Sequence, residues 1–255
     1  MSFDVVIPAR YASTRLPGKP LRTIAGRPML EHVYRRALES GANRVIIATD
    51  DERIAQAARV FDAEVCMTSM HHRSGTERIA EVAASLNLDD DEVVVNVQGD
   101  EPLIPPAIIR QSARNLANHT QASVATLCEM ITEADDLFDP NVCKVVVDSQ
   151  GYALYFSRAP IPWHRQAFAQ GGQQLPADTQ HFRHIGLYAY RAGFLKHYAG
   201  WSESVLERTE ALEQLRILWQ GHRIHVDLAQ ETPGPGVDSE QDIARVERLL
   251  VSAGK

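Results

Sequence analysis

The sequence predicts an α/β fold: a mixed, mostly parallel sheet with helices on both faces and a small β-rich insertion. Up to residue 118, short apolar runs rich in β-branched residues alternate with segments whose apolar residues recur at helical spacing. Continuous apolar strands between helices are typical of parallel strands buried on both faces. Beyond residue 122, two strand-like runs flank a tight turn at 148–151, which predicts a hairpin instead of a crossover.

The first half is expected to alternate four strands with four helices. Residues 5–7 are β-branched, and Pro8 ends this first strand. A helix is expected to open at Pro28 and to stop at Gly41. Ser74 and Glu77 fit a capping box for a later helix. The other expected strands are 44–49, 65–68 and 92–98, and the helices are 28–40, 51–61, about 79–86 and 106–118.

The second half is expected to carry the insertion. The predicted strands are 122–130, 142–148, 152–156, 184–191 and 223–228. Residues 160–176 predict an irregular loop, 206–219 a single long helix, and 238–251 a terminal helix. We expect one domain over 1–255, with a β-rich subdomain at about 130–192 as a candidate dimer contact.

Composition and charge narrow the class of protein. The 255 residues carry a formal net charge of -7, which argues against a nucleic-acid surface, because backbone binding needs a broad basic face. No apolar run approaches the 18 residues of a membrane span, and the N-terminal stretch lacks a signal-like apolar region, so we expect a cytoplasmic protein without a membrane partner. Three widely spaced cysteines favour reduced thiols over a disulfide or zinc site.

A basic loop follows the first strand, and its positive charge contrasts with the negative net charge of the whole chain. Residues 9–22 contain Arg10, Arg15, Lys19 and Arg22 and no acidic residue. Prolines and Gly18 disfavour a helix here and allow backbone N–H groups to converge on an anion. Several cations suit a polyphosphate. A solvated basic turn fits the composition equally well, and neither a Walker A motif nor GxGxxG is present.

Two aspartates are candidate metal ligands beside such a phosphate. Asp100 follows an apolar strand, so it is expected at the same carboxyl edge of the sheet as the basic loop. A carboxylate near a polyphosphate calls for a divalent cation such as Mg²⁺, although Asp100 also fits a cap of the following helix. Asp238, with Gln241 three residues later, fits a helix N-cap, and the local pattern does not decide between cap and metal ligand.

Seven sequence blocks resemble the 3-deoxy-manno-octulosonate cytidylyltransferases (CMP-KDO synthetases). They are IPARYASTRLPGKPL at 7–21, HRSGTERIAEV at 72–82, VNVQGDEP at 95–102, YFSRAPIPW at 155–163, RHIGLYAYR at 183–191, LEQLR at 212–216 and GVDSEQD at 236–242. The resemblance covers nearly the whole chain in order. It implies a Rossmann-like nucleotidyltransferase that converts CTP and the acid sugar KDO to CMP-KDO and pyrophosphate for lipopolysaccharide synthesis, with Mg²⁺ as cofactor and a homodimer as its assembly.

The resemblance also assigns site residues. The catalytic residues it implies are Lys19, Arg15, Asp100 and Asp238, with Asp100 and Asp238 as metal ligands. The nucleotide-binding residues are Pro8, Ala9, Arg10, Lys19 and Gln98. The sugar-binding residues are Arg158, His184, Tyr188, Glu213 and Gln214, with Arg158 and His184 expected to balance the sugar carboxylate.

Two other functions remain open at this point. A related nucleotidyltransferase for another acid sugar, of the 8-amino-KDO or sialate type, shares the fold. A nucleotide-binding module without chemistry would bind CTP but release no pyrophosphate with any sugar.

Overall fold

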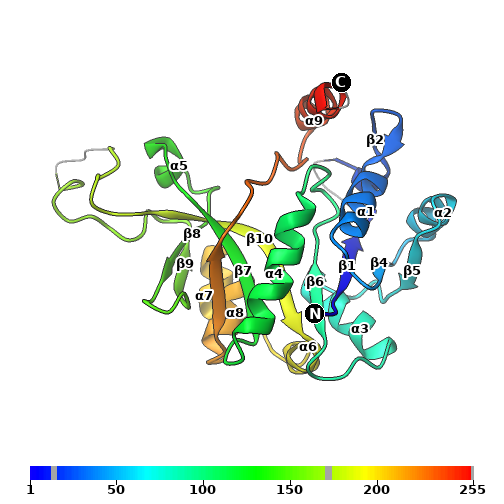
Figure 1. Cartoon of the computed structure of the whole chain (residues 1–255), viewed down its shortest axis with the longest axis horizontal. Coiled ribbons are helices and arrows are strands. Elements are labelled where there is room, and N and C mark those ends of the chain that lie inside the picture. Colours follow the sequence, from blue (N-terminus) through cyan, green and yellow to red (C-terminus); the bar gives the residue numbers. More distant parts are fainter. Residues whose placement is uncertain (13–15, 170–173, 254–255) are drawn as a thin grey trace.

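The computed structural model describes residues 1–12, 16–169 and 174–253 (Figure 1). Its centre is a nine-stranded sheet whose main path runs in the order β11, β7, β10, β6, β1, β4, β5. The bounds of these strands are β11 (Ile224–Leu228), β7 (Val124–Met130), β10 (Phe182–Arg191), β6 (Val93–Asn96), β1 (Asp4–Ala9), β4 (Val45–Thr49) and β5 (Glu64–Met67).

The sheet is mixed and mostly parallel, as predicted. Strand β10 runs antiparallel to both β6 and β7, whereas the β1–β4, β1–β6, β4–β5 and β7–β11 pairs are parallel. The predicted hairpin is present: β8 (Lys144–Val147) pairs antiparallel with β9 (Ala153–Ser157), and β8 joins the end of β10. The hairpin therefore extends the central sheet to one side of the molecule.

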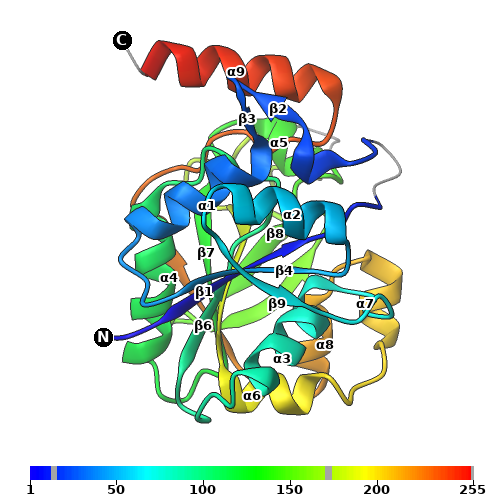
Figure 2. The same cartoon turned by 90° about the vertical axis from the view of Figure 1, so that its right-hand side faces the viewer.

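Helices cover both faces of the sheet (Figures 1 and 2). One core contains apolar residues of α1 (Met29–Glu39), α2 (Glu52–Val60) and α4 (Pro106–Asn118). The opposite core contains those of α3 (Gly75–Ser85), α6 (Ala192–Tyr198) and α8 (Gln214–Trp219). Strand β1 shows the alternation, because Val5 and Ile7 enter the first core and Val6 enters the second. The apolar run at residues 5–7 of this strand is buried on both faces of the sheet, as the sequence predicts.

The predicted single helix over 206–219 is wrong. The structure has two short helices, α7 (Val205–Glu210) and α8, separated by Ala211 in the left-handed region at φ 51°. Arg216 donates from Nε to Glu207 Oε2 over 2.8 Å. Nine residues of continuous helix would separate these two positions by about 13 Å along the axis, so the break is what brings this buried pair together.

The sequence pattern also missed three short elements. These are α5 (Ala134–Phe138), α6, and the two-stranded ribbon of β2 (Thr23–Ile24) and β3 (Arg27–Pro28). A single helical turn, η1 (Lys19–Leu21), interrupts the basic loop. Such elements are too short for hydrophobic periodicity to reveal them.

The terminal helix α9 (Glu240–Ala253) lies across the β2–β3 ribbon (Figure 2). Ile243 and Val246 pack with Leu16, Ile24 and Met29 in a small core of their own. The Arg22 guanidinium and the Glu240 carboxylate form an ion pair at 2.6 Å. This packing returns the end of the chain to the basic loop near its beginning.

Among the described residues, no helix combines the length and the hydropathy that a bilayer crossing requires.

Candidate active site

A cavity of about 400 Å³ opens at the carboxyl edge of the sheet, where β1 and β6 end. Its walls come from the end of β1, the basic loop, the start of α1 and α3, the turn after β6, and the segment before α9. The lining residues are Pro8, Ala9, Arg10, Ala12, Lys19, Pro20, Met29, Gly75, Gln98, Gly99, Asp100 and Asp238. The structure thus brings the expected nucleotide-binding residues and both aspartates to one cavity, as the rule for parallel sheets anticipates.

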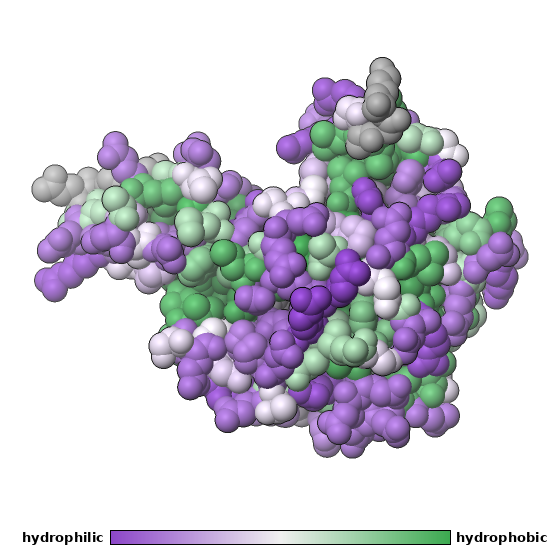
Figure 3. All heavy atoms as spheres, in the orientation of Figure 1, coloured by the Kyte–Doolittle hydropathy of each residue, from purple (hydrophilic) through white to green (hydrophobic). Residues whose placement is uncertain are grey.

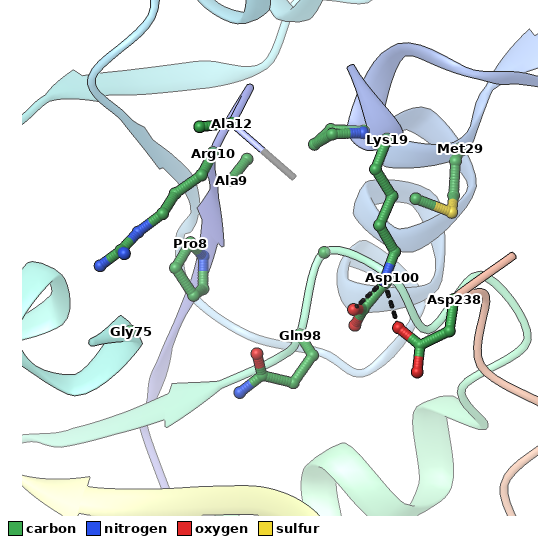
Figure 4. A pocket seen from close by; sticks show the side chains of 12 residues that line it. Pro8, Ala9, Arg10, Ala12, Lys19, Met29, Gly75, Gln98, Asp100 and Asp238 are labelled. Carbon is green, nitrogen blue, oxygen red and sulfur yellow. Dashed lines mark hydrogen bonds and ion pairs between the residues drawn. The ribbon is translucent and has the colours of Figure 1, made fainter. Parts of the chain in front are cut away.

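Lys19 joins the two aspartates (Figure 4). Its Nζ donates to Asp100 Oδ2 over 2.6 Å and to Asp238 Oδ1 over 2.9 Å. Burial acts to lower the pKa of Lys19, but Asp100 and Asp238 outweigh it, so this pKa is raised above its ordinary value. The ammonium is therefore fully charged at neutral pH, and the side chain is 12% exposed.

Glycines set the backbone around this contact. Gly18 precedes η1 at φ 66°, and a Cβ there would meet the Tyr11 ring at 3.3 Å. A Cβ on Gly99 would lie 3.0 Å from the carbonyl oxygen of Pro8, so the turn after β6 approaches β1 more closely than a side chain allows. This close approach holds Asp100 next to the end of the first strand.

The sequence left open whether Asp100 and Asp238 cap helices or face the cavity. Helix α4 begins at Pro106 with Pro105 as its N-cap, so Asp100 does not cap it. Near α9, Asp242 accepts from the backbone N–H groups of Asp238 and Ser239, over 3.1 and 2.8 Å. The Asp238 carboxylate itself accepts from Lys19. Both carboxylates therefore face the cavity.

The donor set suits a hard divalent cation. Asp100 and Asp238 both contact one cation, the Lys19 ammonium, which marks a position for positive charge beside the two carboxylates. Across residues 1–12, 16–169 and 174–253, no group of three or more His, Cys, Asp or Glu side chains is arranged to hold a metal ion. Two carboxylates fit Mg²⁺, because this ion usually takes one or two carboxylates and completes its shell with water and substrate phosphates.

Arg10 points away from Lys19, across the cavity towards the start of α3 (Figure 4). Its Nη2 donates to the Ser74 carbonyl oxygen over 3.0 Å. Burial and the nearby Arg78 lower its pKa, although a guanidinium stays charged at neutral pH. Arg15, the remaining expected cation of the catalytic set, lies outside the described residues.

A second cavity of about 240 Å³ adjoins the first, and the two share Gly75 and Gln98 in their walls. Three of the expected sugar-binding residues line it: Tyr188 from β10, Glu213 from the break between α7 and α8, and Gln214 from the start of α8. Its other lining residues are Thr76, Asn96, Gly186, Tyr190, Tyr198 and Ile217. The helix break that the sequence did not predict is thus what delivers Glu213 and Gln214 to the site.

His184 and Arg158 lie apart from this second cavity. His184 lines a third cavity of about 320 Å³, which meets the second at Gly186, and its Nε2 lies 2.9 Å from Thr126 Oγ1. Burial lowers the pKa of His184 to about 3, so the imidazole is neutral at pH 7. The Arg158 guanidinium donates to the carbonyl oxygens of Glu210 and Pro140, over 2.6 and 2.9 Å. A neutral imidazole offers hydrogen bonds, and the expected part of His184 in balancing the sugar carboxylate stays a prediction.

Sequence reasoning missed Tyr190 and Tyr198 as wall residues. The alternation of residues 184–191 puts Tyr190 on the same strand face as Tyr188, and that signal could have found it. Tyr198 lies in α6, a helix that the sequence pattern did not predict.

A family model described as cytidylyltransferase matches residues 5–224. The 3-deoxy-manno-octulosonate cytidylyltransferase of Pasteurella multocida is 58% identical over 255 residues, covering 98% of each chain. That of Vibrio vulnificus is 58% identical over 252 residues, covering 99% of each.

Solved structures agree with these relatives. CMP:2-keto-3-deoxy-manno-octonic acid synthetase complexed with CTP superposes with a TM-score of 0.90 at 40% identity, over 99% of this chain and 100% of that one. A nucleotidyl transferase from Methanothermobacter shares the fold, with a TM-score of 0.60 at 14% identity over 99% of both chains.

Proposed function

Because this chain belongs to the family of 3-deoxy-manno-octulosonate cytidylyltransferases, we propose that its two adjoining cavities hold CTP and KDO for transfer of the CMP group. The chain is a nucleotidyltransferase that activates KDO with CTP, yielding CMP-KDO and pyrophosphate for lipopolysaccharide synthesis. The observation that carries the site assignment is the Lys19 contact, which joins Asp100 to Asp238 beside the wall that the two cavities share.

The larger cavity is assigned to CTP. Pro8, Ala9 and Gln98 line it on one side for the nucleoside, and Lys19 and Arg10 line it as cations for the phosphates. At an effective dielectric near 20, one close ion pair contributes up to about 4 kcal/mol before desolvation is subtracted. Arg15 belongs to the same loop and is proposed as a further phosphate contact. The expected consequence is tight binding of a triphosphate in a chain whose net charge is negative.

The smaller cavity is assigned to the sugar. Tyr188, Glu213 and Gln214 offer hydroxyl, carboxylate and amide groups to its hydroxyls. His184 can hydrogen-bond as a neutral imidazole at the neighbouring cavity, and Arg158 remains a proposed contact for the sugar carboxylate. The wall shared by the two cavities brings the sugar hydroxyl close to the α-phosphate.

The reaction then needs positioning and charge neutralisation, with no covalent nucleophile from the protein. An oxygen–phosphorus bond forms between the sugar hydroxyl and the α-phosphorus, the bond to the β-phosphate oxygen breaks, and the hydroxyl proton passes to solvent. Lys19 and Arg15 would hold the departing pyrophosphate. Asp100 and Asp238 would hold Mg²⁺, which would neutralise phosphate charge and lower the pKa of the attacking hydroxyl. Because CTP is a cytoplasmic nucleotide, we place the reaction in the cytoplasm.

We also propose that the enzyme is a homodimer, formed through the side lobe. This lobe consists of α5, the β8–β9 hairpin and residues 160–169, and it projects from the sheet (Figure 1). Among the described strands, β9 pairs with β8 and so forms a sheet edge. Leu154 on β9 and Trp163 are 61% and 56% exposed. Figure 3 shows apolar residues between polar ones on this lobe. Exposed apolar residues beside a free strand edge are typical of an association surface.

Pyrophosphate release tests the proposed function. Purified protein with Mg²⁺ and CTP is assayed with KDO, 8-amino-KDO and sialate, and ATP, GTP and UTP replace CTP as controls. We expect turnover with CTP and KDO at least tenfold above every other pair. Higher turnover with another sugar would reassign the substrate, and CTP binding without pyrophosphate from any sugar would establish a module without chemistry.

A further inference from the structure

We propose that Tyr198 is a positioning residue for sugar recognition. Its hydroxyl fixes the Glu213 carboxylate so that this carboxylate can accept hydrogen bonds from the hydroxyl groups of the acid sugar. The inference rests on the proposed function and deepens it. It concerns a residue that the sequence pattern passed over.

The contact between the two side chains is short and partly buried. Tyr198 Oη donates to Glu213 Oε1 over 2.6 Å. Burial and the neighbouring Glu213 raise the pKa of Tyr198 well above its ordinary value, so the phenol keeps its proton and acts as the donor. A neutral donor on an anionic acceptor makes a charge-assisted bond, which is stronger than a bond between neutral groups.

The ring of Tyr198 is held in place from several sides. It is 0% exposed and packs against Phe194 and Trp201, with ring centroids 5.9 and 5.7 Å apart. The Arg216 guanidinium lies over it at 4.8 Å from the centroid, and Arg216 is itself paired with Glu207. The packing around the ring therefore fixes the position of the Tyr198 hydroxyl.

Glu213 needs such a partner because of where it lies. It follows Ala211, which adopts the left-handed conformation, and it immediately precedes α8. A glutamate has three side-chain torsions, and fixing them costs conformational entropy unless a contact selects one conformer in advance. The bond from Tyr198 occupies one oxygen and leaves the remaining acceptor sites of the carboxylate for the cavity.

The charge of the cavity then sets the orientation of the sugar. Among the described residues that line the second cavity, Glu213 is the charged side chain, and no Lys or Arg accompanies it. A carboxylate there accepts from sugar hydroxyls and repels the sugar's own carboxylate. The fixed Glu213 thus directs the hydroxyl groups of the sugar into the second cavity. The carboxylate of the sugar then faces the cationic side of the site.

The test compares Tyr198→Phe with wild type in the pyrophosphate assay. A bond to a charged acceptor discriminates by roughly 10- to 100-fold, and because Tyr198 acts through Glu213 we expect a rise in the KM for KDO of about tenfold. The KM for CTP is expected to stay within about twofold, since Tyr198 lines the second cavity and not the first. Tyr34→Phe is the matched control, because Tyr34 is a buried tyrosine on α1 that packs on Phe61 outside the described linings of both cavities.

A double-mutant cycle with Glu213→Gln separates positioning from direct contact. If Tyr198 works through Glu213, Tyr198→Phe raises the KM for KDO less than twofold in the Glu213→Gln background. Fully additive effects would overturn the proposal, because Tyr198 would then act on the sugar by itself. Calorimetric KDO binding replaces turnover where Glu213→Gln is too slow to assay.

Thermal melting of each variant completes the test. A lower melting temperature with an unchanged KM for KDO would show that the hydroxyl serves the fold alone, and would overturn the proposal. This outcome differs from failure of the proposed function, in which wild type itself releases no pyrophosphate from CTP and KDO.

Discussion

Lys19 neutralises two carboxylates that come from positions far apart in the chain and would otherwise repel each other. One ammonium forms ion pairs with both Asp100 and Asp238. We propose that Asp100 and Asp238 would hold a divalent cation when the triphosphate binds, and that Lys19 would then contact phosphate oxygens.

At the residue scale, Asp100→Asn is expected to lower kcat at least tenfold in saturating Mg²⁺. The amide keeps the size of the side chain and removes the charge that would bind the cation, and a tenfold loss corresponds to only about 1.4 kcal/mol of activation free energy. The measurement is pyrophosphate release as a function of Mg²⁺ concentration. Asp135→Asn, at an exposed aspartate on α5, is the control. Near-normal turnover of Asp100→Asn would exclude Asp100 as a metal ligand.

At the scale of elements, the break between α7 and α8 is stabilised by side chains that a continuous helix would separate. Ser204 and Glu207 form a capping box at the start of α7, and the Glu207 carboxylate also accepts from Arg216 on α8. Arg216 is 2% exposed and lies over the ring of Tyr198. The pair therefore couples the backbone turn that carries Glu213 to the tyrosine that contacts it.

Arg216→Met is expected to lower the free energy of unfolding by about 3 kcal/mol, because it leaves the buried Glu207 carboxylate without its charged partner. Urea unfolding followed by circular dichroism measures the change. Arg208→Met, at an exposed arginine of α7, should stay within about 0.5 kcal/mol of wild type. Equal effects of the two variants would show that the pair does not hold the break.

At the scale of the whole molecule, the side lobe is expected to make the enzyme a dimer. Light scattering after size-exclusion chromatography should give twice the 28.4 kDa chain mass. Leu154→Lys should shift the protein towards monomer, because it places a charge on the edge strand. Leu38→Lys, at an exposed leucine of α1, should leave the mass unchanged. A monomeric wild type would refute the assembly.

Stability should also depend on pH through the buried His225. Its ring stacks on His119 at 3.4 Å, and burial together with His119 lowers the pKa of His225 below the ordinary 6.5. The unfolded chain therefore binds a proton near pH 6.5 that the folded chain resists, so the stabilisation from this group is complete above pH 6.5 and declines as the pH falls below it.

The measurement is the difference in unfolding free energy between pH 7.5 and 5.5. His225→Gln is expected to lose less stability over this interval than wild type. Other titrating groups, among them Glu101, whose pKa burial and Asp100 raise to about 7, cancel in the comparison. His71→Gln, at an exposed histidine, should match wild type. An unchanged pH dependence in His225→Gln would contradict the assignment.

Much of the fold and part of the site follow from local patterns in the chain. The apolar runs that became β1, β4 and β6 are recognisable because strands buried on both faces must be apolar throughout. Since parallel strands end at a common edge, the same pattern predicts that the basic loop and Asp100 lie together. The family likeness of seven ordered blocks identified the substrates, which no periodicity can do.

The tertiary structure alone decided the rest. Asp238 has the local signature of a helix cap, and only the packing of α9 on Ile24 and Met29 turns it to Lys19. Residues 206–219 have the composition of one helix, and the break at Ala211 comes with a contact between Glu207 and Arg216 that one continuous helix would prevent. The alternation of apolar and polar residues along β10 is the same for either strand direction. The sequence therefore did not predict that β10 runs antiparallel to its neighbours. Each of these features depends on contacts between residues distant in sequence, whereas local patterns report on neighbours within a few positions.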